Sequence, residues 1–182
     1  MTADEEPKKT PVPGLEELAS QYAAKARQLD KVLSEITKDY CANKCTDLPV
    51  GCCFHDFANH EVEDGLAKAL GKIYEKEARK KAFLERVAYS ACDYHTRQGC
   101  VLETKPHVCL GFLCDELSDH LMLKYRWYRD IETNAISFVN SMRSIKSVFF
   151  SFSTSPGLFF YMDKAIESGN AIVEFENSRR LR

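Results

Sequence analysis

Eight cysteines fall into two groups of four, and they are the residues of this 182-residue chain best suited to chemistry. The first group is Cys41, Cys45, Cys52 and Cys53, and the second group is Cys92, Cys100, Cys109 and Cys114. Thiolates are strong ligands for zinc, ferrous iron and iron–sulfur clusters. Buried hydrophobic cysteines would explain one or two of these residues, but not an adjacent pair in a polar stretch. The grouping therefore predicts a metal site with all eight cysteines as ligands.

The spacing of the cysteines does not choose the metal. It reads Cys-x3-Cys-x6-Cys-Cys in the first group and Cys-x7-Cys-x8-Cys-x4-Cys in the second. Neither group has the Cys-x2-Cys pairs of zinc ribbons or the cysteine run of bacterial ferredoxins. Zinc, iron and an iron–sulfur cluster all stay open as the cofactor. A disulfide framework and a redox-active dithiol without metal are the alternatives.

Residues beside the cysteines supply further candidates. Neutral imidazole is a good ligand for zinc or iron, and His55 follows Cys53 by two residues. Asp56 is the matching candidate for a carboxylate that hydrogen-bonds a ligand. For each histidine taken singly, including His95 and His107, an ordinary loop residue bonded to solvent or backbone is the simpler interpretation. His55 is the favoured additional ligand.

The late cysteine block carries a family resemblance. Gly51-Cys52-Cys53 after spaced cysteines, followed by Lys105-Pro106 and Phe112-Leu113-Cys114 inside the second group, resembles the YkgJ-type cysteine-cluster family. The resemblance covers residues 41–114 and implies a zinc- or iron-chelating domain. The family's usual Tyr-x-x-Arg-Pro is Glu103-Thr104-Lys105-Pro106 here. A flagellin lysine methylase family carries a related cluster, which keeps an iron–sulfur assignment open.

Composition bounds the class of protein. Hydrophobic residues make up 45% and charged residues 29%, as in ordinary globular proteins, and the net charge of −2 gives no general basic field for nucleic acid. No window reaches the roughly 18 apolar residues of a membrane span, and no secretory signal is evident. We therefore expect a cytoplasmic protein with neither a nucleic-acid nor a membrane partner. No phosphate-binding loop or hydrolase motif is present, so catalytic residues stay unknown and enzymatic activity stays open.

Hydrophobic periodicity predicts an all-α scaffold with two cysteine-rich metal-binding loops between helices. We expect a disordered N-terminus over residues 1–13 and a single helical domain over 14–182. Within that domain the cysteine cluster core spans 41–114 and a C-terminal helical extension spans 115–182.

Single elements follow from the same periodicity and from glycine and proline positions. The stretch Lys76 to Lys81 is expected to be solvated, and the last dozen residues are open between a helix and a short strand. The expected elements are a helix from 14 to 40, a loop over 41–57, a helix from 60 to 87, a loop over 91–114, one long helix or two over 115–152, and a helix over 158–168 that ends at Gly169-Asn170.

The leading hypothesis is a metal-binding cysteine-cluster protein. One alternative is an iron–sulfur redox or group-transfer enzyme, or a component of one. The other is a protein-interaction module with structural zinc, whose partner binds the aromatic C-terminal helices.

Overall fold

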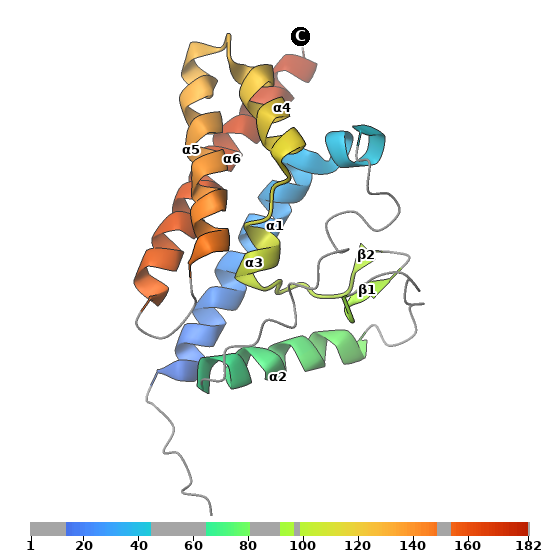
Figure 1. Ribbon diagram of the computed structural model, residues 1–182, viewed down its shortest axis with the longest axis vertical. Helices are drawn as coiled ribbons and strands as arrows, with labels where there is room; N and C mark the ends of the chain where they lie inside the picture. The colour runs from blue at the N-terminus through green and yellow to red at the C-terminus, as the bar shows by residue number, and fades with distance from the viewer. Residues whose placement is uncertain (1–13, 45–64, 81–91, 97–98, 149–153, 182) are drawn as a thin grey trace, which may run out of the picture.

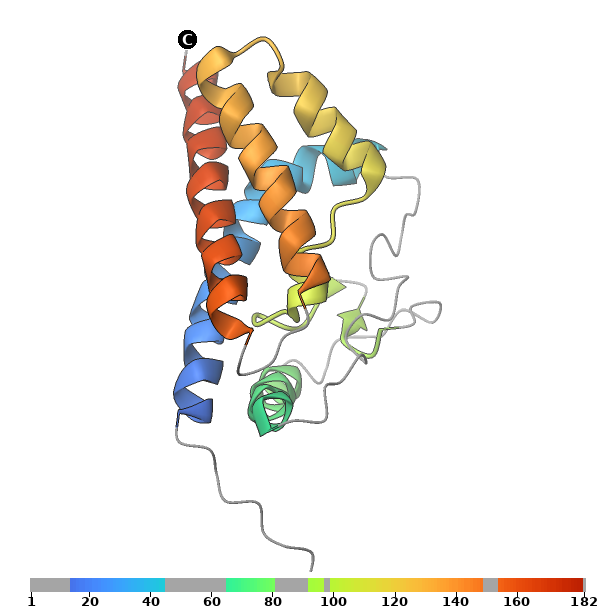
Figure 2. The same cartoon turned by 60° about the vertical axis from the view of Figure 1, so that its left-hand side comes forward.

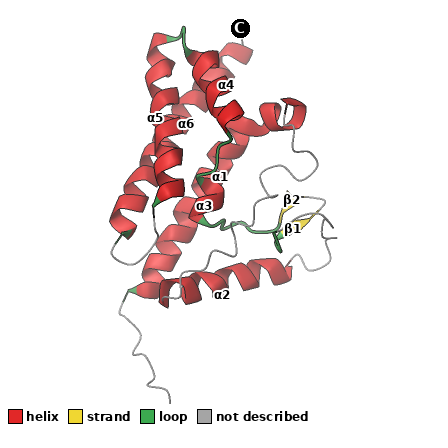
Figure 3. Ribbon diagram, viewed as in Figure 1, coloured by secondary structure: helices red, strands yellow, loops and turns green. Residues whose placement is uncertain are grey.

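A computed structural model describes residues 14–44, 65–80, 92–96, 99–148 and 154–181 of the chain. The described part is mostly helical, which confirms the all-α class (Figure 3). None of the described helices is both long enough and apolar enough to cross a lipid bilayer. The predicted disorder of residues 1–13 lies outside the described residues. The elements are α1 (Leu15–Lys44), α2 (Gly65–Lys80), β1 (His95–Thr96), β2 (Gly99–Cys100), α3 (His107–Leu110), α4 (Asp115–Tyr125), α5 (Arg129–Ser147) and α6 (Ser155–Arg180).

Three long helices form the body of the protein. In Figures 1 and 2, α6 runs beside both α5 and α1, and the contacts between these helices are extensive. Apolar side chains at spacings of three and four place one face of each helix in a shared core. Burial of each large side chain, such as Phe138 or Met142, contributes about 1.5–3 kcal/mol. The largest fully buried residues are Tyr22, Leu29, Leu66, Leu110, Leu121, Tyr125, Phe138, Met142, Ile145, Leu158, Met162 and Ile172.

The expected helix end at Gly169 is wrong, because α6 continues to Arg180. Gly169 lies where α6 crosses α1 and α5 at close range. A Cβ atom at this position would lie 2.3 Å from Cγ1 of Val32 and 3.2 Å from Cε2 of Phe138. The glycine serves helix packing and not helix termination. The last dozen residues, left open between helix and strand, continue α6 up to Arg180.

The run after residue 115 forms two helices and not one. The break between α4 and α5 contains neither glycine nor proline, and the residue that precedes α5 is Tyr128. The Tyr128 ring packs 5.0 Å from the Phe175 ring, centroid to centroid, and the Arg179 guanidinium lies 4.8 Å from the Tyr128 ring. Side chains of α6 therefore pack against the turn between α4 and α5. Contacts between residues so far apart in the sequence cannot be read from local hydrophobic periodicity.

The second cysteine segment, expected to be a loop, contains short regular elements beside α2 and α1. Strands β1 and β2 pair antiparallel, with His95 opposite Cys100 and Thr96 opposite Gly99. Gly99 has φ +106°, a conformation that residues with a side chain rarely adopt. The chain then passes through α3 to the beginning of α4. Helix α2 lies across the lower end of α1 (Figure 1) and is unbroken at Gly71.

Gly111 brings the end of α3 into contact with the backbone of α5. A Cβ atom on Gly111 would lie 2.4 Å from the Lys146 backbone nitrogen and 2.7 Å from the Met142 carbonyl oxygen. Backbone atoms cannot move aside as a flexible side chain can. The absence of a side chain at residue 111 therefore fixes the distance between the cysteine segment and the helical bundle.

We predict that Gly111→Ala lowers the free energy of unfolding by about 1–3 kcal/mol, the usual cost of overpacking. Gly71→Ala is the matched control, because no atom lies within 4 Å of a Cβ built there. Inside α2 the control should stabilise by up to about 1 kcal/mol through helix propensity. Urea unfolding followed by circular dichroism measures both changes. Equal stability of the two variants would contradict the close contact between α3 and α5.

Candidate metal centre

The structure describes five of the eight cysteines. Cys41 lies in α1, Cys92 precedes β1, Cys100 ends β2, Cys109 lies in α3 and Cys114 immediately precedes α4. No disulfide joins any two of these five. The expectation that Cys41 lies in a loop is wrong, because α1 extends to Lys44. The remaining predicted ligands and neighbours, which are Cys45, Cys52, Cys53, His55 and Asp56, lie outside the described residues.

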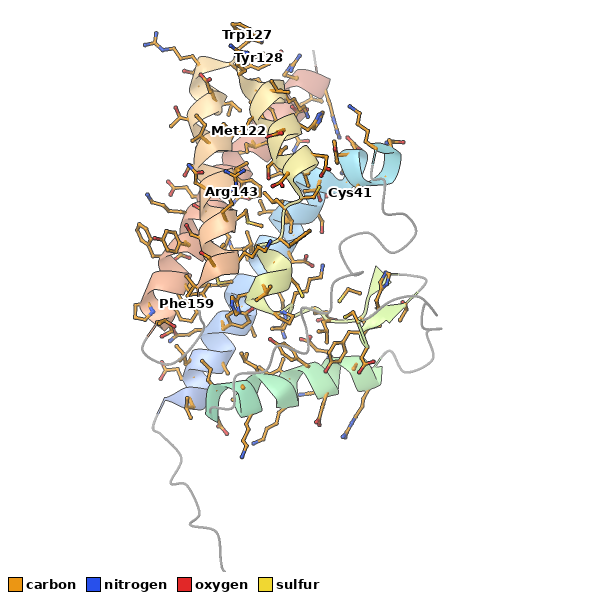
Figure 4. The ribbon with its side chains drawn as sticks, viewed as in Figure 1. Cys41, Met122, Trp127, Tyr128, Arg143 and Phe159 are labelled. Carbon is orange, nitrogen blue, oxygen red and sulfur yellow. The ribbon has the colours of Figure 1, made fainter. Side chains whose placement is uncertain are left out.

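Cys41 and Cys114 come together although they belong to different cysteine groups. Both side chains are half-buried and pack against the edge of the hydrophobic core. Figure 4 shows Cys41 on α1 near the beginning of α4. Burial raises the pKa of the Cys114 thiol most, and the Leu117 backbone N–H opposes it. The Glu116 carboxylate raises this pKa further, and the charge of Cys41 adds a smaller contribution. Each thiol is thus close enough to the other for their charges to interact.

Cys92 and Cys100 form a second neighbouring pair at the β1–β2 hairpin. Cys92 is buried and Cys100 is half-buried. Burial raises the pKa of the Cys100 thiol and the charge of Cys92 adds to this, whereas the cationic Lys105 opposes it. Deprotonation of both thiols in this partly desolvated pair is therefore unfavourable unless a cation lies close to them.

His95 lies in the same hairpin, directly across from Cys100 in the strand register. Its backbone N–H donates to the Cys92 carbonyl oxygen at 3.3 Å. The side chain is only 6% exposed, and its ring nitrogen Nδ1 has no hydrogen-bond partner among the described residues. Burial lowers the pKa of His95, which favours the neutral imidazole. Cysteine spacing does not reveal strand register, so it does not distinguish His95 from the other histidines.

Cys109 lies on α3 beside two buried tyrosines. Burial raises the pKa of Tyr22 and of Tyr74, and the charge of the Cys109 thiolate contributes in both cases. The Tyr22 and Tyr74 hydroxyls are hydrogen-bonded to each other. The Tyr22 hydroxyl also donates to the Lys105 carbonyl oxygen at 2.6 Å. Cys109 therefore lies close to Tyr22 of α1 and Tyr74 of α2.

A buried carboxylate holds the segment between Cys100 and Cys109. Glu77 on α2 is 4% exposed. Its Oε2 accepts a hydrogen bond from the Thr104 backbone N–H at 2.8 Å, and its Oε1 accepts from the Thr104 hydroxyl at 2.8 Å. Arg27 of α1 donates to Oε1 at 2.9 Å. The expectation that residues 76–81 are uniformly solvated is wrong at Glu77.

Lys105 adds a second attachment to α1. Its ammonium donates to Oδ1 of Asp30 at 2.5 Å, and both side chains are largely buried. Together these contacts tie the chain between two candidate ligands to two helices. We call these five residues the polar anchor: Arg27, Asp30, Glu77, Thr104 and Lys105.

The donor chemistry of the described residues fits zinc or iron. Thiols and one buried imidazole are the donors that these metals prefer, whereas calcium and magnesium prefer oxygen. Within the described ranges, no three side chains of His, Cys, Asp or Glu already form a group that could hold an ion. The arrangement therefore supplies pairs of donors and not a complete coordination sphere.

No protein-family model, curated protein or solved structure matches the chain. The resemblance to the YkgJ-type family consequently stays a prediction, and the functional argument depends on the geometry of the described residues.

We predict that Glu77→Gln lowers the free energy of unfolding by about 1.5–3 kcal/mol near pH 7, the usual contribution of charge-assisted hydrogen bonds. Burial opposes ionisation of Glu77, but hydrogen bonds from Arg27 and Thr104 outweigh it and hold its pKa below the ordinary value. Because the folded pKa is the lower one, this stabilisation is complete above the unfolded pKa of about 4.3 and is lost as pH falls through the folded value.

Denaturant unfolding of wild type and Glu77→Gln between neutral and acid pH measures this effect. The stability difference should be constant at neutral pH and should shrink below about pH 4.3. Glu75→Gln is the control. The Glu75 carboxylate is 67% exposed, and its ion pair in the described part of the chain is with the exposed side chain of Arg79. A difference that stays unchanged in acid would show that ionised Glu77 does not hold the segment.

Proposed function

We propose that this protein binds zinc or iron through cysteine thiolates, with Cys92 and Cys100 as one donor pair and Cys41 and Cys114 as another. The observation that carries the proposal is that four of the described cysteines come in two neighbouring pairs. Cys41 lies in α1 and Cys114 immediately precedes α4, whereas Cys92 precedes β1 and Cys100 ends β2.

The electrostatics of the pairs supports a cation as the partner. Burial raises the pKa values of Cys100 and Cys114, and the charge of the neighbouring thiol adds to this, so these two thiols favour the protonated form at neutral pH. A divalent cation reverses this balance, because it stabilises thiolates directly and displaces their protons. Metal binding would then release protons and join α1 to α4 and β2 to the segment before β1.

The complete ligand set in this proposal includes the other predicted cysteines. Zinc takes four ligands and an iron–sulfur cluster four thiolates, so two thiols alone complete neither. Cys45, Cys52, Cys53 and Cys109 supply further donors, and His55 and Asp56 remain the candidates beside them. The resemblance to a zinc- or iron-chelating family supports the same assignment.

The polar anchor would act as the positioning device of the site. It holds the chain between Cys100 and Cys109 against α1 and α2 through contacts that involve no cysteine. Lys105 would offset part of the thiolate charge, since its cation already opposes the raised pKa of Cys100. A segment held in this way loses less conformational entropy when its thiols bind a metal.

Elemental analysis of anaerobically purified full-length protein, with a visible spectrum of the same sample, tests the proposal. We expect stoichiometric zinc or iron, reduced to about half or less in Cys92→Ser and in Cys114→Ser. Ser34→Ala on the exposed face of α1 is the control and should keep the wild-type content. Iron with a broad band near ~400 nm and acid-labile sulfide would assign a cluster and favour redox chemistry, whereas colourless zinc protein would assign a structural site. Wild-type protein with neither metal would contradict the proposal.

A further inference from the structure

The β1–β2 hairpin places an imidazole and a thiol on one face. Residues directly opposite in an antiparallel pair direct their side chains to the same side, with Cβ atoms about 4.5–5.5 Å apart. His95 and Cys100 are such a pair. The register is supported beyond the strands, because the Val101 N–H donates to the Tyr94 carbonyl oxygen at 2.9 Å. A backbone hydrogen bond inside the hairpin thus fixes which residue faces Cys100.

Cys92 is tied to the same place through the backbone. Its carbonyl oxygen accepts the His95 N–H at 3.3 Å, which closes a turn immediately before β1. Its charge reaches the Cys100 thiol. The described chain therefore places one thiol and one imidazole in the β1–β2 hairpin, and a second thiol just before β1 on a residue whose backbone is hydrogen-bonded to His95.

One ring nitrogen of the buried His95 side chain finds no hydrogen-bond partner among the described residues. The side chain is 6% exposed, and the nitrogen without a described partner is Nδ1. An unsatisfied buried polar group costs about 1–3 kcal/mol, and native proteins rarely leave one without a reason. His107 shows the contrast, because the backbone of Val148 hydrogen-bonds to its ring. A buried ring nitrogen without a partner, opposite Cys100 in the strand register, is explained if it binds a metal.

We infer that His95 is a metal ligand, which completes a two-thiolate, one-imidazole donor set with Cys92 and Cys100. The inference rests on the proposed function and names a nitrogen donor that the cysteine pattern does not contain. Two thiolates and a neutral imidazole around a divalent cation carry no net charge, whereas four thiolates leave −2. A neutral centre is the less costly one to hold in a partly buried hairpin.

Binding at this set releases two protons, one from each cysteine, and none from His95. Within the described ranges, these three side chains do not form a group that could hold an ion. The backbone register that brings them together is already present. One position of a four-coordinate zinc ion then remains for a further donor.

Zinc titration of the full-length protein against a competing chelator, combined with zinc X-ray absorption, tests this inference. In the wild type we expect sulfur neighbours at about 2.3 Å and nitrogen at about 2.0–2.1 Å with imidazole scattering. His95→Gln should weaken zinc binding at one site by about tenfold to hundredfold or more, and should lower the imidazole scattering. His120→Gln, on α4 and stacked on Tyr40, is the matched control and should change neither.

His95→Cys keeps the inference falsifiable if His95→Gln folds poorly. A thiol at residue 95 should restore zinc affinity and raise the number of sulfur neighbours by one at that site. Unchanged affinity and unchanged scattering in His95→Gln, with binding weakened in Cys92→Ser, would overturn the role of His95 and leave the proposed function intact. Wild-type protein that binds no zinc or iron would overturn both.

Discussion

The position of the cysteine segment depends on the hydrogen bonds that the buried Glu77 carboxylate accepts. An ionised carboxylate out of contact with water is costly unless donors surround it, and here Arg27 and Thr104 provide three hydrogen bonds. These donors belong to α1 and to the chain after β2, so one side chain of α2 connects three parts of the molecule. Cys100 and Cys109 flank the connected residues. Their position is therefore set by a polar contact as much as by apolar packing.

The opposite side of the segment is fixed by sterics. Gly111 touches the α5 backbone, and α5 in turn packs along α6 in the main core. A segment held by hydrogen bonds on one side and by backbone contact on the other has little freedom to move its thiols. The same bundle brings the α1 end, with Cys41, to the beginning of α4, with Cys114. Helix packing thus accounts for the pairing of cysteines from the two sequence groups.

Periodicity was sufficient to predict the helical class, because apolar spacing in α1 and α5 reports directly on a buried face. It failed where a distant contact decides the local structure. Glycine often ends a helix, but Gly169 lies inside α6 where that helix packs closely against α1 and α5. Tyr128, which precedes α5, packs against Phe175 of α6. Glu77 sits among lysines and is buried by partners far away in the sequence. The role proposed for His95 likewise depends on strand register, and the metal site itself stays a prediction from the cysteine grouping.

Residue-resolved alkylation of native protein by mass spectrometry, with and without a chelator, is the most direct test of thiolate ligation. It reports on each cysteine separately, including the three that the structure does not describe. If the account is right, Cys41, Cys92, Cys100 and Cys114 are protected in metal-loaded protein, and chelation exposes the members of each pair together. Equal alkylation rates of these four thiols with and without chelator would contradict the account, because their protection would then come from burial and not from a bound metal.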